Sequence, residues 1–108
     1  MKKFIVLYHA SPEAMAEMSK EPPTEETMKP WMDWAQKCGS KLIDLGNPLF
    51  GGVRLSPDGK NTASSKGVVG YSVLQANDLE DAKSLLKDHP HLGWHGGCDI
   101  ELHEAMAM

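Results

Sequence analysis

Apolar residues recur along the chain at the two spacings typical of strands and of helices. Residues 4–8 form a continuous run of β-branched and aromatic side chains, which predicts a strand buried on both faces. Residues 68–76 predict a second long strand. Residues 98–104 alternate between apolar and polar side chains, so Ile100 and Leu102 are expected to share one face of a third strand.

A fourth strand is predicted at residues 41–48, between the other strands in sequence. Alternation puts Ile43 and Leu45 on one face of this strand and Asp44 on the other. The following residues 50–65 are rich in Gly, Ser and Asn, which predicts a loop with a Pro-Asp-Gly turn and a short strand before that turn.

A short helical turn is predicted after the first strand. Ser11 offers an N-cap and Pro12 suits the first helical position, so residues 14–18 are expected to be helical. Pro22 and Pro23 are expected to stop this turn.

A longer amphipathic helix follows, with Thr24 as its cap and Gly39 at its end. Its apolar stripe consists of Met28, Trp31, Met32, Ala35 and Cys38. Pro30 conflicts with an unbroken helix, so either the helix begins near Thr27 or it is kinked at the proline.

The last predicted helix begins at a capping box in residues 77–80 and ends before Pro90. Its buried stripe consists of Leu79, Ala82, Leu85 and Leu86.

The resulting order, β-α-β-β-α-β, predicts an α+β fold of the ferredoxin-like type with both helices on one face of the sheet. The opposite face still carries apolar residues from the strands predicted at residues 4–8 and 68–76, and a domain this small can scarcely leave them in water. Two copies packed face to face about a twofold axis, as in a dimeric α/β barrel, solve this problem and enclose a space between the sheets.

Composition restricts the possible functions. The 108 residues suffice for a single domain, and 15 acidic against 11 basic residues give a net charge of −4, which excludes a basic nucleic-acid surface. The longest apolar run is too short to cross a bilayer or to serve as a signal peptide. The two cysteines are therefore expected to be free thiols of a cytoplasmic protein.

Candidate catalytic residues are those that the alternation turns toward the space between the sheets. Asp44, Glu101 and His103 fall on the predicted inner face, and the first strand adds Tyr8 or His9. A carboxylate beside a partly desolvated histidine can act as a general acid–base pair. The alternative is that these side chains are hydrogen-bonded or solvated at the sheet edges.

Two further residues are candidates for ligand binding. Ser72 alternates with Tyr71 on the strand predicted at residues 68–76, and either set of residues can line the space. Trp34, at the edge of the predicted helical stripe, either walls a pocket or belongs to the core.

Histidines cluster near the end of the chain without a recognisable metal motif. His89, His91, His95 and Cys98 are residue types that zinc or copper accepts, but their spacing matches no closed zinc site. No metal and no cofactor is therefore predicted, and His89 is expected to act as a cation at a helix C-terminus.

Several segments resemble the YCII-related, or DGPF-domain, proteins over nearly the whole chain. The segments that carry this resemblance are residues 30–35, 45–49, 69–72, 89–92 and 98–102. The resemblance implies a ferredoxin-like fold and a dimeric α/β barrel in a small bacterial protein. Some relatives have a His–Asp pair in the cleft, and one branch is linked to dechlorination of an aromatic compound.

The chain departs from the family pattern at two places. Residues 27–30 lack the histidine that some relatives carry there, and the acid before the glycine-proline unit is altered in residues 46–49. Chemistry would then have to come from Asp44, His9 or His103. Two hypotheses remain: an acid–base enzyme acting on a small, partly apolar molecule, and a non-catalytic ligand-binding or regulatory module.

Overall fold

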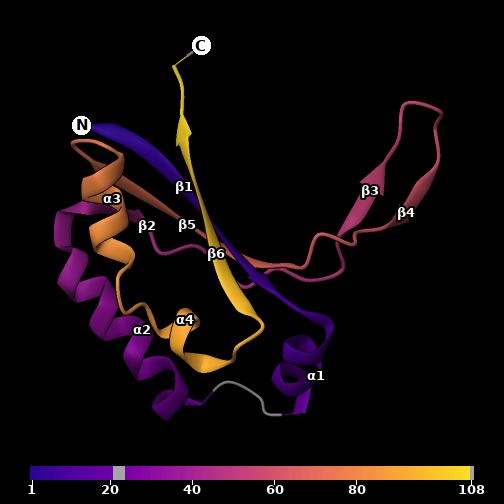
Figure 1. Cartoon of the computed structure of the whole chain (residues 1–108), viewed down its shortest axis with the longest axis horizontal. Coiled ribbons are helices and arrows are strands. Elements are labelled where there is room, and N and C mark those ends of the chain that lie inside the picture. The colour runs from indigo at the N-terminus through magenta and orange to yellow at the C-terminus, as the bar shows by residue number, and fades with distance from the viewer. Residues whose placement is uncertain (21–23, 108) are drawn as a thin grey trace.

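A computed structural model describes residues 1–20 and 24–107 of the chain (Figure 1). The elements are β1 (Lys2–Ala10), α1 (Pro12–Lys20), α2 (Glu25–Cys38), the 3-10 turn η1 (Gly39–Lys41), β2 (Leu42–Asp44), β3 (Val53–Leu55), β4 (Asn61–Ala63), β5 (Val68–Ala76), α3 (Leu79–Leu86), α4 (Pro90–Trp94) and β6 (Cys98–Ala105). The predicted stop at Pro22 and Pro23 lies outside the described residues.

The main sheet has four antiparallel strands in the order β2-β5-β1-β6. This order, with β1 and β5 adjacent at the centre, is that of a ferredoxin-like fold, so the predicted fold class is confirmed. Figure 1 shows α2 and α3 on one side of the strands and the β3–β4 hairpin projecting away from them.

The core lies between the sheet and the helices. Phe4, Val6 and Leu74 are fully buried there, and Ile100 and Leu102 pack against the same cluster. Their placement under the helices, predicted from the alternation, is confirmed.

The other side of the sheet, which we call the open face, is uncovered by helices. Strand pairing aligns Ile5 with Val73, and Leu7 with Tyr71, on this side. The open face carries Ile5, Leu7, His9, Tyr71, Val73, Asp99, Glu101 and His103. Its four central apolar and aromatic side chains are only half-buried in the single chain.

Helix α2 is rotated relative to the predicted stripe. Trp34 and Cys38 are buried, whereas Met28 and Met32 are 40% and 50% exposed. The helix begins at Glu25 behind the Thr24 cap and runs through Pro30, so the start near Thr27 is wrong. Trp34 is therefore a core residue at the centre of the buried side rather than at its edge.

Strand β2 is shorter than predicted, and its phase differs. Leu42 and Leu45 pack against the core, while Ile43 is 49% exposed. Alternation fails because the chain turns at Gly46, whose φ is 80° and whose N–H donates to Asp44 Oδ1 at 2.8 Å. A Cβ at this position would overlap the carbonyl oxygen of Tyr71, so glycine is required there.

The segment predicted as a loop forms a β-hairpin. Strands β3 and β4 pair, Ser64 N–H donates to the carbonyl of Gly52 at 2.9 Å, and Ser56 N–H donates to that of Lys60 at 3.0 Å. Three-residue strands flanked by Gly and Ser give too little alternation to predict the second strand.

The connection from α3 to α4 corrects two further predictions. Asp78 caps α3 by accepting from Asp81 N–H at 2.8 Å, but α3 ends at Leu86. Pro90 begins α4 rather than ending the preceding helix, and His89 is the N-cap of α4. His89 is therefore not a cation at a helix C-terminus.

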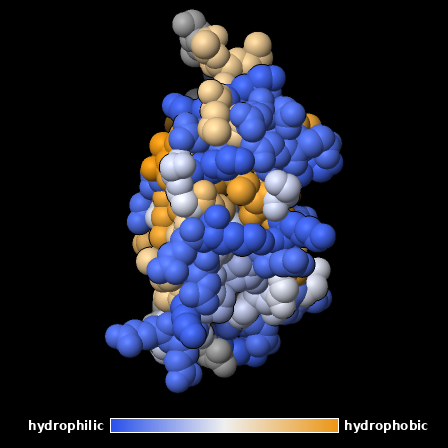
Figure 2. All heavy atoms as spheres, turned by 90° about the vertical axis from the view of Figure 1, so that its left-hand side faces the viewer, coloured by the Kyte–Doolittle hydropathy of each residue, from blue (hydrophilic) through white to orange (hydrophobic). Residues whose placement is uncertain are grey.

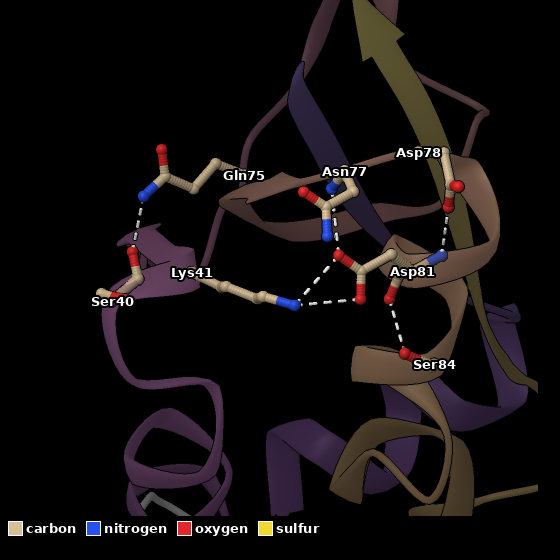
Figure 3. Close-up of polar contacts among 7 residues, drawn as sticks. All are labelled: Ser40, Lys41, Gln75, Asn77, Asp78, Asp81 and Ser84. Atoms are coloured by element: carbon tan, nitrogen blue, oxygen red, sulfur yellow. Dashed lines mark hydrogen bonds and ion pairs between the residues drawn. The ribbon is translucent and has the colours of Figure 1, made fainter. Parts of the chain in front are cut away.

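Polar contacts join the start of α3 to η1, the turn that follows α2 (Figure 3). Lys41 Nζ lies 3.0 and 2.9 Å from the two carboxylate oxygens of Asp81, and Asn77 N–H donates to Asp81 Oδ2 at 3.0 Å. These hydrogen bonds lower the pKa of Asp81 below its ordinary value of 3.8, and the one from the Asn77 backbone N–H has the larger effect. The ionised carboxylate thus ties two helical segments together.

The helix-covered side is mainly hydrophilic, with apolar atoms visible between the polar side chains (Figure 2). In residues 1–20 and 24–107, none of the helices has both the length and the apolar character needed to cross a bilayer.

Candidate functional site

The polar centre of the open face is His9, at the end of β1. Its Nδ1 atom lies 3.5 Å from Asp99 Oδ1 and 3.6 Å from Glu101 Oε2, and its side chain is only 17% exposed. Strand pairing explains the arrangement, because His9 is opposite Asp99 and its neighbour Leu7 is opposite Glu101. Two carboxylates therefore converge on one nitrogen of the imidazole.

Glu101 also contacts the second imidazole of the open face. Its Oε1 atom lies 2.8 Å from His103 Nε2. The hydrogen bond with His103, and to a smaller extent the charge of His9, lower the pKa of Glu101 below its ordinary value of 4.5. Glu101 is thus ionised at neutral pH and lies between two histidines.

A cavity of about 520 Å³ opens beside His9. Its wall combines the His9 imidazole and the Asp99 carboxylate with Lys66, hydroxyl groups such as that of Ser11, and the apolar Met15. A hollow with a few charged groups and apolar surface suits a small, partly apolar molecule.

Behind the sheet, a buried chain of hydrogen bonds fixes the strand that carries His9. Ser72 Oγ donates to the carbonyl of Leu45 at 2.6 Å, so the Tyr8 hydroxyl, 2.7 Å away, must donate to Ser72. His89 Nδ1 accepts from His91 N–H at 3.0 Å, which leaves Nε2–H to donate to Tyr8 at 3.2 Å. In this series of hydrogen bonds, each of the side chains of His89, Tyr8 and Ser72 donates one hydrogen bond and accepts another.

Burial maintains this pattern of protons. Desolvation raises the pKa of Tyr8 to about 12, although its hydrogen bond with Ser72 opposes the shift. Desolvation, assisted by the charge of His91, lowers the pKa of His89 to about 3. His89 is consequently neutral at physiological pH and stays in the Nε2–H tautomer.

Histidine and tryptophan side chains complete the support. His91 Nε2 donates to the backbone carbonyl of His9 at 2.8 Å, which holds the end of β1 from the helix side. The His89 ring lies 4.6 and 4.4 Å, centroid to centroid, from the rings of Trp31 and Trp34. The residues under the helices thereby position His9 without touching the open face themselves.

The structure divides the predicted ligand-binding residues between two faces of the sheet. Glu101 lies on the open face beside His9, but Tyr8, Ser72 and Trp34 lie under the helices. Tyr8 and Ser72 therefore do not face the space between two sheets, and of the two alternatives for Trp34 the structure has the core one. Tyr8 follows Leu7 and precedes His9, so alternation must turn it to the opposite face.

The predicted catalytic residues are also separated. His9 and His103 both contact Glu101, whereas Asp44 lies on β2 at the opposite edge of the sheet from β6. Three strand spacings of about 4.8 Å put these edges roughly 14 Å apart. The Asp44 carboxylate instead accepts the Gly46 N–H, so Asp44 and His103 form no pair within one chain.

Two residues of the site, Asp99 and Lys66, are absent from the sequence-based candidates. The alternation of Glu101 and His103 extends back to Asp99 and could have identified it. Lys66 follows the hairpin, and no sequence pattern indicates its position. Among the described residues, no group of three or more His, Cys, Asp or Glu side chains is arranged to hold a metal ion.

The arrangement defines a ferredoxin-like α+β protein with a polar site on its open face. No protein-family model matches the chain, and no curated protein matches it significantly in sequence. Among solved structures, it is similar to 5-chloro-2-hydroxyhydroquinone dehydrochlorinase (TftG) from Burkholderia phenoliruptrix AC1100, in complex with 2,5-dihydroxybenzoquinone. The match has a TM-score of 0.53 at 12% identity and covers 92% of this chain and 90% of that one. At this identity the similarity shows the fold alone.

Proposed function

We propose that this chain is a YCII-related, cytoplasmic homodimer that binds a small molecule between two open faces and acts on it by acid–base chemistry. The observation that supports this best is the position of His9, between two carboxylates at the edge of a 520 Å³ cavity. Two buried, unpaired cysteines agree with a reducing compartment.

The exposed apolar side chains of the sheet support the dimer. Ile5, Leu7, Tyr71 and Val73 form a contiguous, half-buried group that no helix covers. A contiguous apolar surface of this kind favours association, and a twofold axis lets each copy cover the other. The ligand then lies in a cleft whose walls are two copies of the same face.

His9 is the proposed proton acceptor and donor. The carboxylates near its Nδ1 atom stabilise the imidazolium that forms when His9 takes a proton. Its Nε2 atom is then available to the ligand, and Lys66 can attract an acidic group on it. These groups favour a small, partly apolar molecule with an ionisable hydroxyl or carboxyl group.

A first probe is 2,5-dihydroxybenzoquinone, the molecule in the TftG complex. Binding raises the melting temperature of the native protein, and His9→Asn and Glu101→Gln should each abolish the rise. Glu80→Gln is the matched control, because Glu80 lies on α3, away from the open face. Binding that is equal in wild type and His9→Asn would contradict the proposed site.

Non-catalytic binding is the second candidate, and one feature of the geometry favours it. The His9–carboxylate distances of 3.5 and 3.6 Å exceed those of a short charge-assisted hydrogen bond. Absorbance and mass spectrometry of the recovered probe separate the two functions. A changed product that disappears in His9→Asn supports the enzyme, whereas a bound probe returned unchanged supports the binding module.

A further inference from the structure

The β3–β4 hairpin is a projection with almost no support from its own chain. We call residues 53–63, which comprise β3, β4 and their turn, the arm. All six residues of its two strands are exposed, and in the described chain the arm strands pack substantially only on each other. The Cα radius of gyration is 15.0 Å, above the about 13 Å of a compact chain of this length.

One side of the arm is apolar. Val53 and Leu55 are 61% and 74% exposed, and alternation places them on the same side of the ribbon, with Arg54 on the other. Phe50, just before the arm, is 97% exposed. An isolated two-stranded hairpin is at best marginally stable in water, so an ordered ribbon with this apolar side requires a surface to cover it.

The arm lies on the correct side of the molecule to reach a second copy. It projects away from α2 and α3, on the side of the sheet that the helices leave open (Figure 1). Most of the side chains left half-buried on the open face are themselves apolar or aromatic, namely Ile5, Leu7, Tyr71 and Val73. An apolar ribbon and an apolar sheet face are matching surfaces.

Area also favours a contribution from the arm. A typical stable interface buries about 800 Å² of solvent-accessible surface on each partner, a quantity that exceeds the flat outline of the same contact. The open face is roughly 30 Å long and 15 Å wide, given the usual rise per residue and strand spacing. Because β2 spans only three residues, this face alone offers less than about 450 Å² of flat contact, and the arm adds to it.

Charges on the two surfaces are complementary. The arm carries Arg54 and Lys60 against a single acid, Asp58. Strand β6 turns Asp99 and Glu101 to the open face and carries no lysine or arginine. Lys60, at the turn of the arm, makes no ion pair among the described residues, so it can reach the carboxylates of another molecule.

We infer that the arm of each protomer packs its Val53–Leu55 side on the open face of the other, so that each site is completed by the partner's arm. This inference rests on the proposed homodimer and goes beyond it, because sheet-to-sheet packing alone does not require an arm contact. The open face of one protomer then forms a wall of each cleft, and the arm of the partner covers that cleft.

A photo-crosslinker tests the contact directly. p-Benzoylphenylalanine replaces Leu55 in the full chain, and unlabelled protein is mixed with ¹⁵N-labelled protein before irradiation. We expect a covalent dimer whose crosslinked peptides join arm and β1 or β5 of different isotopic origin. The same label at position 62, on the other side of the ribbon, should give little covalent dimer.

Dimer affinity gives a second measurement. Leu55→Glu should raise the dissociation constant of the dimer about a hundredfold, because each dimer carries the change twice and each lost leucine contact is expected to cost about tenfold. Thr62→Glu, an equal charge on the opposite side, should leave it within about twofold.

The outcomes separate this inference from the proposed function. If wild type is dimeric, but position 55 crosslinks only within its own chain, only to the other arm or not at all, the inference is overturned and the dimer stands. The same holds if Leu55→Glu dimerises like wild type. A wild type that is monomeric at all concentrations overturns the proposed dimer itself, and the arm contact with it.

Discussion

The neutral, buried His89 makes the stability of this protein sensitive to mild acid. His89 Nδ1 accepts the His91 N–H, and its Nε2–H donates to Tyr8. Protonation of Nδ1 would remove the acceptor for His91 and place a charge among buried aromatic rings. The folded state therefore resists protonation at a pH where the unfolded chain accepts it.

The magnitude follows from the two pKa values. Burial lowers the pKa of His89 from 6.5 to about 3 in the folded protein. Stability from this shift is fully present above the unfolded value and is lost as the pH falls from there toward the folded value. At about pH 5 the loss is about 2 kcal/mol, since each pH unit below 6.5 costs about 1.4 kcal/mol.

The assay compares wild type with His89→Asn. Asparagine can still cap α4 by accepting the residue-91 N–H, but it does not titrate. Urea unfolding is followed by tryptophan fluorescence at one fixed protein concentration, at about pH 8 and about pH 5. Wild type should lose about 2 kcal/mol more than the variant between these pH values. Equal losses in the two proteins would refute the reasoning, whatever their absolute stabilities.

Three further predictions concern Tyr8 and Asp81, which form the hydrogen bonds behind and beside the sheet. Tyr8→Phe leaves His89 Nε2–H without its acceptor and should lower the free energy of unfolding by about 1–3 kcal/mol. A change below about 0.5 kcal/mol in urea unfolding would contradict the buried series of hydrogen bonds. In a Tyr71→Phe background, where Tyr8 is the only tyrosine, phenolate absorbance should rise only near pH 12. Asp81→Asn should lower the urea midpoint at neutral pH, and because the pKa of Asp81 is lowered by folding, this difference should shrink as the pH falls below 3.8. A midpoint gap that is constant with pH would show that the charge of Asp81 is not involved.

The long elements could be predicted from the sequence because their patterns are strong. The runs that form β1, β5 and β6 have clear periodicity, and the ferredoxin-like order follows from them. Strand β2 was mispredicted in phase, because a side chain-to-backbone bond from Asp44 and a left-handed Gly46 end the strand early. Local turn chemistry of this kind overrides alternation.

The site was only partly predictable. Glu101 and His103 follow from strand alternation, but alternation alone left Tyr8 or His9 as the candidate on the first strand, and the pairing of β1 with β6 selects His9. The cap role of His89 had an available signal, since the proline after it suits a first helical position. The contact between His91 and the His9 carbonyl had none, because it joins residues 82 positions apart.

Sedimentation equilibrium on wild type and Leu7→Arg tests most directly whether the open face is an interface between two copies. Leu7 lies on the open face, and Leu79→Arg, at the start of α3, is a matched control. Wild type and Leu79→Arg should sediment as dimers, with twice the 11.9 kDa mass of one chain. Leu7→Arg should sediment as a monomer of 11.9 kDa and should keep the circular dichroism spectrum of the wild type. A monomeric wild type, or a Leu7→Arg variant that remains dimeric, would contradict the proposed cleft.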